Sequence, residues 1–580
     1  MHVVATAGHV DHGKSTLVRA LTGMEPDRWA EERRRGMTID LGFAWTTLGS
    51  GETVAFVDVP GHERFVPNML AGIGPVPAAM IVVAADEGWM PQSAEHLAAL
   101  AALDVRHGLL VVTRSDLADP GPATAAALTE IAATPLGEVP AVAVSGVTGL
   151  GLDELRTALD ALVTALPAPD TTSPVRLWID RSFTVKGAGT VVTGTLGAGT
   201  LRLGDELTLG DGLVRVRGLQ SLGKPADSVQ AVARVAVNLR GAARDDVSRG
   251  DALLTPGRFR PTDLIDIRLH GDPTADLPTT MTLHAGSAAV PVRVRPLGPD
   301  TARLRLSRPL PLRIGDRLLL RDPGRHHVAG GVTVLDVAPP GLRRRGAATA
   351  RAHVLDTMDG HPSLAGELTR RQLIRAPDLA AMGVPLPPAA APVAGDWYAD
   401  PVLWTSLAER LPHEVATYQR EHPLEPGLPI EALRHRLGLP DRALVTALVR
   451  PPLSVRAGRV AAGPSGPPDE LVALVAKAFD GLGPFTAPEA NDLTALGLGP
   501  RQLAAAARTG LVVQLAPQVV LAPGAAEAAA TALAALPQPF TLSEARRALD
   551  TTRRVAVPLL ELLDRRHLTE RLPDDRRQLR

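Results

Sequence analysis

The stretch that decides the fold is GHVDHGKS, residues 8–15, in which two glycines five positions apart are followed by Lys14 and Ser15. Residues 2–7 are a short apolar run that predicts a buried strand. Residues 14–23 carry apolar residues at helical spacing and end in a glycine, which predicts a helix. A strand, a glycine loop and a helix in this order are the context of a phosphate-binding loop.

The chemistry of this loop suits a nucleoside triphosphate with Mg²⁺. The glycines let backbone N–H groups turn toward the phosphates, and the helix N-terminus adds its positive end. Lys14 is one of four lysines among 61 basic residues, and its compact ammonium reaches phosphates where a guanidinium fork does not fit. Ser15 is the expected Mg²⁺ ligand. A glycine turn that happens to precede a lysine is the alternative for this motif alone. The expected nucleotide-binding residues here are Gly8, His9, Val10, Asp11, His12, Gly13, Lys14, Ser15 and Thr16.

Three later segments follow in the order that a GTPase needs. The apolar run 53–58 ends in Asp58, which would hold Mg²⁺ through water, and the amide of Gly61 could bond the γ-phosphate. Two further apolar runs, near 78–84 and 107–113, alternate with helical stretches. This alternation predicts a parallel sheet with helices on both faces over residues 1–166.

The end of the third run is the expected base-recognition loop. The carboxylate of Asp116 can accept two N–H bonds from guanine N1 and N2, a pair that adenine does not offer. Thr113 and Arg114 precede it. A last strand brings a further short loop near the base, made of Ser145, Gly146 and Val147.

The rest of the chain divides into two kinds of sequence. After a proline-rich linker, 166–174, short alternating runs with glycine turns predict two small β-barrels, 175–257 and 258–340. Beyond residue 346, helices followed by short apolar hairpins predict a tandem of α+β winged helices. The expected units are 347–400, 401–466, 467–526 and 527–580. The predicted fold is therefore multidomain: an α/β P-loop GTPase domain, two barrels and four winged helices.

Composition excludes several classes of site and location. With 580 residues and a net charge of −1, the chain has no global basic field for nucleic acid. It has no cysteine, which excludes disulfides and thiolate chemistry. The start resembles no signal peptide and no long apolar run predicts a membrane span. We expect a cytoplasmic monomer.

Three motifs resemble the translational GTPases related to elongation factor Tu: GHVDHGKS, RGMTIDLGFA (35–44) and DVPGHERF (58–65). The resemblance implies that Thr38 closes on Mg²⁺ and the γ-phosphate, and that His62 orients the attacking water. The base motif departs from the usual N-K-x-D of that group. Thr113 lacks the amide that normally ties this loop to the phosphate loop, and Arg114 could lay its methylene stem along the base.

The winged-helix tail narrows the resemblance, since elongation factor Tu ends after its second barrel. The tail, the segment 22–42, the segment IDRSFTVKGAGTVVTGT (179–195) and a base motif that begins with threonine resemble the bacterial selenocysteine-specific elongation factors. That family implies ribosome-stimulated hydrolysis of GTP to GDP. It also implies binding of selenocysteinyl-tRNA and a messenger RNA hairpin, and delivery of the tRNA to the ribosome at UGA codons.

Two groups of arginines are the candidate RNA and aminoacyl contacts. By the same resemblance, Asp180, Arg181 and Arg234 form a pocket for the aminoacyl group, where a selenolate would favour arginine over neutral partners. An ordinary surface ion pair is the alternative. In the last winged helix, residues 551–567 are the expected recognition helix, and a solvated arginine-rich face is the alternative. The candidate RNA contacts are Arg546, Arg547, Arg553, Arg554 and Arg571.

Other functions remain open at this level. They are a general aminoacyl- or initiator-tRNA carrier, a GTP-regulated nucleic-acid-binding adaptor, and a GTPase subunit of a sulfate-activating enzyme. The long tail argues against the first and third, and the GTPase with two barrels argues against the second.

Overall fold

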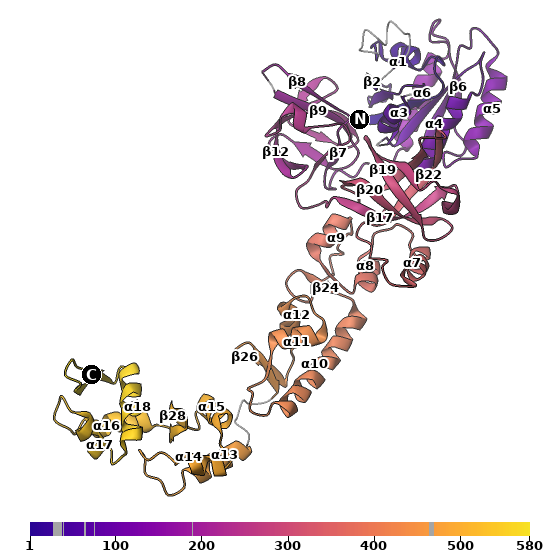
Figure 1. The fold of residues 1–580 in the computed structure, drawn as a ribbon. Coiled ribbons are helices and arrows are strands. Elements are labelled where there is room, and N and C mark those ends of the chain that lie inside the picture. Colours follow the sequence, from indigo (N-terminus) through magenta and orange to yellow (C-terminus); the bar gives the residue numbers. More distant parts are fainter. Residues whose placement is uncertain (27–37, 39, 63–64, 75, 188, 463–468) are drawn as a thin grey trace. The chain divides into compact units, whose positions relative to one another are not determined.

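The computed structural model describes residues 1–26, 38, 40–62, 65–74, 76–187, 189–462 and 469–580. The chain divides into two compact units, Met1–Ala390 and Ala391–Arg580, and each is described by itself (Figure 1). The segment 27–37 and residue 39, which hold most of the RGMTI motif, lie outside the described residues.

The first unit begins with a six-stranded sheet of order β2-β3-β1-β4-β5-β6, in which only the β2–β3 pair is antiparallel. Its strands are β1 (His2–Ala7), β2 (Gly42–Thr47), β3 (Thr53–Asp58), β4 (Ala78–Ala84), β5 (His107–Thr113) and β6 (Ala141–Ala143). The helices are α1 (Lys14–Thr22), α3 (Val66–Ile73), α4 (Pro91–Ala102), α5 (Pro120–Ala132) and α6 (Leu152–Ala165). The predicted α/β domain is confirmed.

Both faces of this sheet are covered by helices. Val4 packs on one face with residues of α1 and α6, whereas Val3 and Ala5 pack on the other with residues of α3, α4 and α5. Every residue of β4 is buried. This explains the continuous apolar runs, because a parallel strand buried on both faces shows no polar alternation.

Two β domains follow the linker. The first has a sheet of order β7-β16-β11-β12-β15-β9-β8, with β13 paired to β12, and a separate β10–β14 pair. Its strands are β7 (Arg176–Trp178), β8 (Arg181–Val185), β9 (Gly189–Leu196), β10 (Thr200–Arg202), β11 (Glu206–Leu209), β12 (Gly212–Ser221), β13 (Lys224–Ala226), β14 (Ser228–Gln230), β15 (Ala233–Arg240) and β16 (Ala252–Leu254).

The second β domain is a closed barrel of order β17-β20-β19-β18-β21-β22. Its strands are β17 (Thr262–Gly271), β18 (Thr280–Ala285), β19 (Ala288–Pro296), β20 (Thr301–Leu310), β21 (Arg317–Asp322) and β22 (His327–Asp336). Full closure leaves no unpaired strand edge in this domain.

Three helices follow the closed barrel: α7 (Ala347–Asp356), α8 (Leu364–Arg371) and α9 (Ala376–Met382). A buried ion-pair network joins the barrel to α7 and α8. Asp266 accepts from Arg303 at 2.6 and 2.9 Å and from Arg351 at 2.7 Å. Arg351 also reaches Asp336 at 2.6 Å, and Arg371 bonds the same carboxylate at 2.5 Å. Because such pairs require particular partners in particular places, they specify how these helices dock rather than adding much stability.

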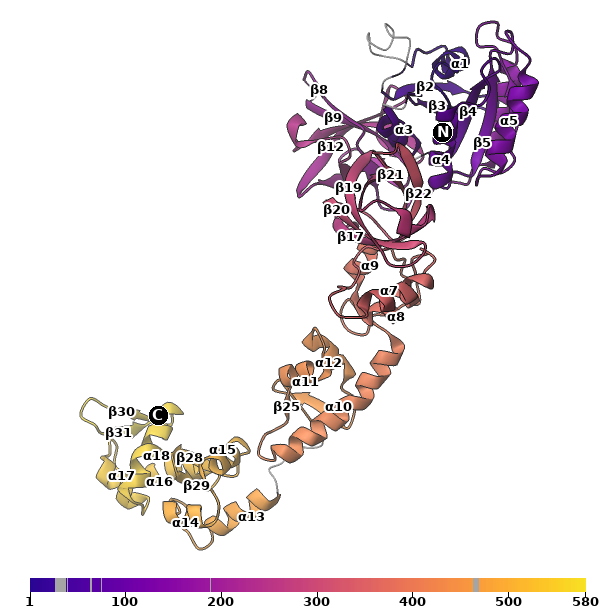
Figure 2. The same cartoon turned by 45° about the vertical axis from the view of Figure 1, so that its right-hand side comes forward.

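The second unit repeats a helical bundle followed by a hairpin. Its elements are β24 (Trp397–Ala399), α10 (Pro401–Glu421), β25 (Leu428–Pro429), α11 (Ile430–Leu437), α12 (Arg442–Leu448), β26 (Leu453–Arg456), β27 (Arg459–Ala462), α13 (Asp469–Ala478), α14 (Ala490–Ala495), α15 (Pro500–Arg508), β28 (Val513–Ala516), β29 (Val519–Leu521), α16 (Ala525–Leu533), α17 (Leu542–Ala548), α18 (Arg553–Arg565), β30 (Thr569–Arg571) and β31 (Arg577–Leu579). Figure 2 shows the β30–β31 hairpin beside α18. The predicted winged-helix architecture of the tail is confirmed, whereas its division into four units with the bounds given above stays a prediction.

Each of the last two winged helices has its own hydrophobic cluster, and the hairpin of the earlier one also packs into the core of the last. Leu515 and Leu521 of the β28–β29 hairpin pack in the same cluster as Val555, Leu559 and Leu563 of α18. Residues 527–580 by themselves would lack part of that core, so tests of the last domain need the full chain.

We predict that Gly331→Ala in β22 weakens the packing of the GTPase domain on the closed barrel. A Cβ at Gly331 would lie 2.1 Å from the carbonyl oxygen of Ala102, at the end of α4, so backbone must move. Overpacking of this kind costs about 1–3 kcal/mol. Thermal denaturation should show a lower Tm. Gly341→Ala, which meets nothing within 4 Å, is the matched control, and an equal Tm for both variants would contradict the prediction.

Candidate functional site

The phosphate loop has the backbone geometry that its glycines predict. Gly8 has φ +143°, and a Cβ there would lie 2.1 Å from the carbonyl oxygen of Val82. Gly13 has φ +81° and precedes α1. Lys14 is 6% exposed, and its Nζ donates to the carbonyls of His9 at 2.6 Å and Gly8 at 3.0 Å. The loop therefore closes tightly around the Lys14 ammonium. This agrees with the expectation that a lysine stands here because the loop has no room for the guanidinium that the chain uses elsewhere.

Oxygen ligands for Mg²⁺ converge beside this loop. The Ser15 hydroxyl donates to the buried Asp58 carboxylate at 2.6 Å and lies 2.8 Å from the Thr38 hydroxyl. Thr6 donates to the other Asp58 oxygen at 2.7 Å, which orients the carboxylate. A carboxylate and hydroxyl oxygens are the ligands that Mg²⁺ prefers, with phosphate oxygens and water completing its shell. The three expected metal residues therefore fit the ion.

The base loop corrects one expectation from the sequence. Thr113 was expected to lose the tie to the phosphate loop, but its buried hydroxyl donates to the carbonyl of His12 at 2.8 Å. Arg114 donates to Asp86 at 2.9 Å and Glu87 at 2.7 Å, and to the backbone carbonyl of Asp11. A hydroxyl and a guanidinium thus replace the amide as the link between the two loops.

The remaining nucleotide loops are close to their expected places. Asp116 is exposed at the end of β5 and available to a base. The Ser145 hydroxyl accepts from the amides of Val147 at 3.3 Å and Thr148 at 3.1 Å, which fixes the last loop. A Cβ at Gly146 would lie 3.2 Å from the methyl group of Thr16, so this loop packs against the start of α1.

Gly61 and His62 follow β3, next to the phosphate loop. A Cβ at Gly61 would lie 2.6 Å from both the Val10 amide nitrogen and the Lys14 Nζ, so only glycine fits there. His62 is half-buried, with its ring centroid 5.9 Å from that of Phe65.

Helix α4 supports the phosphate loop in a way that no sequence motif indicated. Nδ1 of His96 accepts the Gly8 amide at 3.0 Å, and Oε1 of Gln92 accepts the Val10 amide at 3.0 Å. Burial lowers the pKa of His96 to about 3, which keeps the ring neutral and able to accept. Burial also lowers the pKa of His12 to about 4. The contacts of His96 and Gln92 with the phosphate loop join residues 88 and 82 positions apart, so local sequence carried no signal for them.

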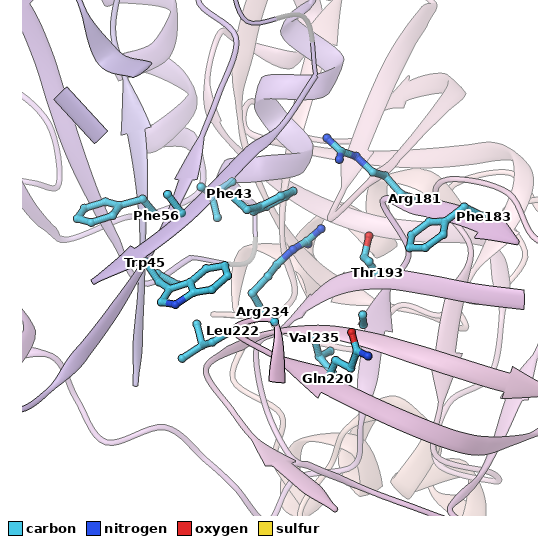
Figure 3. A pocket seen from close by; sticks show the side chains of 15 residues that line it. Phe43, Trp45, Phe56, Arg181, Phe183, Thr193, Gln220, Leu222, Arg234 and Val235 are labelled. Atoms are coloured by element: carbon cyan, nitrogen blue, oxygen red, sulfur yellow. The ribbon is translucent and has the colours of Figure 1, made fainter. Parts of the chain in front are cut away.

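A second site is a pocket of about 220 Å³ between β2 and the first β domain. Figure 3 shows Phe43 and Trp45 of β2 facing Arg181 and Arg234 of the β domain. The three residues predicted for the aminoacyl pocket are brought together here. Asp180 is buried and paired with Arg234 through two contacts, one of 2.8 Å. This pair is buried rather than an ordinary surface pair.

Three further residues contact or lie near these arginines, and the sequence did not point to them; Phe43 is among the residues that line the pocket, whereas Asp40 and Arg249 are not. The Arg234 guanidinium lies 3.8 Å from the centre of the Phe43 ring. Asp40 forms an ion pair with Nε of Arg181 at 2.9 Å. Arg249 lies near this pair: burial lowers its pKa, whereas Asp40 and Asp180 act in the opposite sense.

Together the pocket group holds three guanidinium groups and two carboxylates, which leaves one positive charge. Its members are Asp40, Asp180, Arg181, Arg234 and Arg249. A partly buried site with an excess positive charge favours an anionic group.

The arginines of the last winged helix differ in their surroundings. Arg553 is exposed in the first turn of α18, and Thr552 is its N-cap position without a side-chain cap bond. Arg554 instead contacts the preceding winged helix, with the Pro488 carbonyl at 3.0 Å and Glu489 at 3.2 Å. Arg571 pairs with Asp575 on its own hairpin.

Val555, Leu559 and Leu563 lie on the buried face of α18. Leu562 is only half-buried and Leu560 is buried. The hydroxyl of Thr551 does not cap the helix but donates to the Phe485 carbonyl at 2.5 Å.

Comparison with known families agrees with this architecture. Residues 1–167 match the elongation factor Tu GTP binding domain and residues 189–254 match elongation factor Tu domain 2. Residues 264–341 match the selenocysteine-specific elongation factor β-barrel domain, and residues 531–578 match the elongation factor SelB winged helix. The selenocysteine-specific elongation factor of Escherichia coli (strain K12) is 36% identical over 485 residues, which cover 77% of this chain and 75% of that protein. The chain belongs to the selenocysteine-specific elongation factor family.

Further relatives show the same relationship. The factor of Desulfomicrobium baculatum is 36% identical over 384 residues, 63% of this chain and 60% of that protein. The crystal structure of bacterial selenocysteine-specific elongation factor EF-Sec matches with a TM-score of 0.74 and 25% identity, covering 100% of both chains. The first 167 residues are thus a translational GTP-binding domain, and the ligand of the phosphate loop is a guanine nucleotide with Mg²⁺.

We predict that Thr113→Val weakens GDP and GTP binding about tenfold. The exchange keeps the shape of the side chain but leaves the His12 carbonyl without its buried donor, and such losses cost about 1–3 kcal/mol. Equilibrium binding of a fluorescent guanine nucleotide measures the change. Thr129→Val, which removes a hydroxyl on the exposed face of α5, is the control. Unchanged affinity in the Thr113 variant would show that this hydroxyl does not support the loop.

Proposed function

We propose that this protein is a GTP-dependent translation elongation factor. It binds selenocysteinyl-tRNA and a messenger RNA hairpin, and delivers the tRNA to the ribosome at UGA codons. We place it in the cytoplasm. Among the described residues, no helix is long and apolar enough to span a membrane. The expected monomer stays a prediction.

The charge of the pocket between β2 and the first β domain carries this proposal. A selenol has a much lower pKa than a serine hydroxyl, so a selenocysteinyl group presents a selenolate at neutral pH. A pocket lined by Arg181 and Arg234, with Arg249 close by, stabilises that anion, whereas a neutral hydroxyl gains little from a guanidinium. A general aminoacyl-tRNA carrier would not benefit from this excess charge.

In this proposal, GTP hydrolysis at the nucleotide site times the release of the tRNA. Backbone amides and Lys14 hold the phosphates, and Mg²⁺, when bound, neutralises charge on their oxygens. Thr38 and Ser15 hold the metal, and His62 orients the attacking water. Since water orientation matters only in the transition state, His62 affects hydrolysis and not nucleotide binding.

The last winged helix is the proposed anchor for the messenger hairpin. Arg553 is exposed at the start of α18, where it can reach phosphate. Arg554 is partly held by the neighbouring winged helix, so we assign it a smaller share of RNA binding than Arg553. Sequence preference should come from bases exposed in a loop or bulge, because an A-form stem hides its major groove.

We predict that the full-length protein binds selenocysteinyl-tRNA more tightly than the same tRNA charged with serine, and only in the presence of a GTP analogue. Filter binding with both charged tRNAs, with the analogue and with GDP, measures this preference. Equal binding of the two charged tRNAs would remove the selenocysteine assignment and leave a general carrier as the better proposal.

We predict that Arg553→Ala in the full chain lowers the affinity for a selenoprotein-message hairpin. The variant should also reduce the dependence of binding on salt, because a protein that contacts fewer phosphates releases fewer counterions when it binds. Titrations at two salt concentrations with the hairpin and a scrambled hairpin measure both effects. Arg420→Ala, at an exposed arginine of α10, is the control. If Arg553→Ala and the control behave alike, α18 is not the anchor.

A further inference from the structure

The aminoacyl pocket and the Mg²⁺ site are joined by one short segment. Thr38 lies 2.8 Å from the Ser15 hydroxyl, within the Mg²⁺ ligand set. Two residues later, Asp40 pairs with Nε of Arg181 at 2.9 Å, and the next carbonyl, that of Leu41, accepts from the same guanidinium. An arginine of the β domain is therefore held by residues adjacent to the threonine that contacts the nucleotide site.

A second connection reaches the pocket group from the segment that follows His62. Arg249 donates to the side-chain oxygen of Asn68 at 2.5 Å. Asn68 lies in α3, the helix that follows the His62 loop. The segment that carries Thr38 and the segment that follows His62 thus each contact an arginine of the pocket group.

Phe43 holds the two pocket arginines from the same side. Its ring centre lies 3.8 Å from the Arg234 guanidinium and 5.5 Å from that of Arg181 (Figure 3). Phe43 follows Asp40 by three residues and is buried within β2. The ring is anchored in the sheet, whereas Asp40 lies outside it, so Asp40 is the contact that can change while Phe43 stays in place.

We propose that Asp40 is a positioning residue that makes selenocysteine recognition depend on the bound nucleotide. The inference rests on the proposed aminoacyl pocket. With GTP, Thr38 is held at the metal, and Asp40 keeps Arg181 directed at the aminoacyl group. Two residues span at most about 7 Å, so a larger withdrawal of Thr38 carries Asp40 away and releases Arg181. A released arginine must be ordered again at binding, which costs affinity.

The mechanism makes the GTP form, and not the GDP form, sensitive to Asp40. Asp40→Asn should lower the affinity of the GTP-analogue complex for selenocysteinyl-tRNA about tenfold, a loss between those expected for exposed and for buried ion pairs. In GDP, in which the native protein is not expected to bind this tRNA, Asp40→Asn should make no difference, since the proposal has the contact broken there. Asp40→Glu keeps the carboxylate and should restore affinity to within about threefold, which a purely steric role would not do.

The experiment uses the full chain and compares the Asp40 variants with Arg181→Met and with Asp153→Asn. Asp153 pairs with Arg156 on its own helix and is the matched carboxylate control. Affinities for selenocysteinyl- and seryl-tRNA are measured with GTP analogue and with GDP, together with nucleotide affinity. The proposal expects Asp40→Asn to reduce only selenocysteinyl-tRNA binding in the GTP form.

Three outcomes would overturn the proposal, and they are distinguishable. If Arg181→Met weakens selenocysteinyl-tRNA binding but Asp40→Asn does not, the pocket stands and Asp40 has no positioning role. If Asp40→Asn weakens nucleotide binding equally, Asp40 acts at the nucleotide site itself. If the native protein does not distinguish the two charged tRNAs, the pocket assignment fails as well. Should Asp40→Asn fail to fold, Arg181→Lys, which keeps the charge but lacks the guanidinium fork that contacts Asp40 and Leu41, gives the same comparison.

Discussion

The contact on which the functional architecture depends is the meeting of three side-chain oxygens at Ser15. The Ser15 hydroxyl lies within hydrogen-bonding distance of both the Asp58 carboxylate and the Thr38 hydroxyl. They come from the start of α1, the end of β3 and the segment before β2. A parallel sheet places the carboxyl ends of β1 and β3 side by side, so the fold itself creates the site. Thr38 is the one partner outside a regular element, and it leads directly into the β2 segment that faces the first β domain.

Sequence analysis predicted the parts of this site that depend on local spacing. Lys14, Ser15, Asp58 and Asp116 each follow a recognisable strand or loop, and their chemistry requires those residue types. The contacts that the sequence did not show join distant segments without a motif. His96 supports Gly8 across 88 residues, and Asp40 reaches Arg181 across a domain boundary. The Thr113 error had a related cause. The residue was compared with the asparagine it replaces, although a hydroxyl can bond a carbonyl that lies close enough.

The tail shows a similar division between pattern and packing. Helix and hairpin spacing was sufficient to predict winged helices, because each unit repeats the same local order. The packing of the β28–β29 hairpin into the core of the last unit and the contact of Arg554 with Glu489 were not predictable from that order. At the start of the tail, the Asp266, Arg303 and Arg351 network fixes the docking of α7 on the closed barrel. An apolar contact of the same area would tolerate sliding, whereas paired charges with buried partners do not.

Charge also explains how one pocket can serve both selectivity and control. In the proposed aminoacyl pocket, an excess of one positive charge would favour a selenolate over a hydroxyl, because that preference depends only on which groups are present. Control requires in addition that the charge be held in place in one nucleotide state and not in the other. Arg234 is fixed by Asp180 and Phe43 within the β domain and β2, and so supplies the constant part. Arg181 is held by Asp40 and Leu41, which lie next to Thr38. Under the proposal for Asp40, the division of the two arginines between a fixed and a nucleotide-linked partner separates recognition from timing.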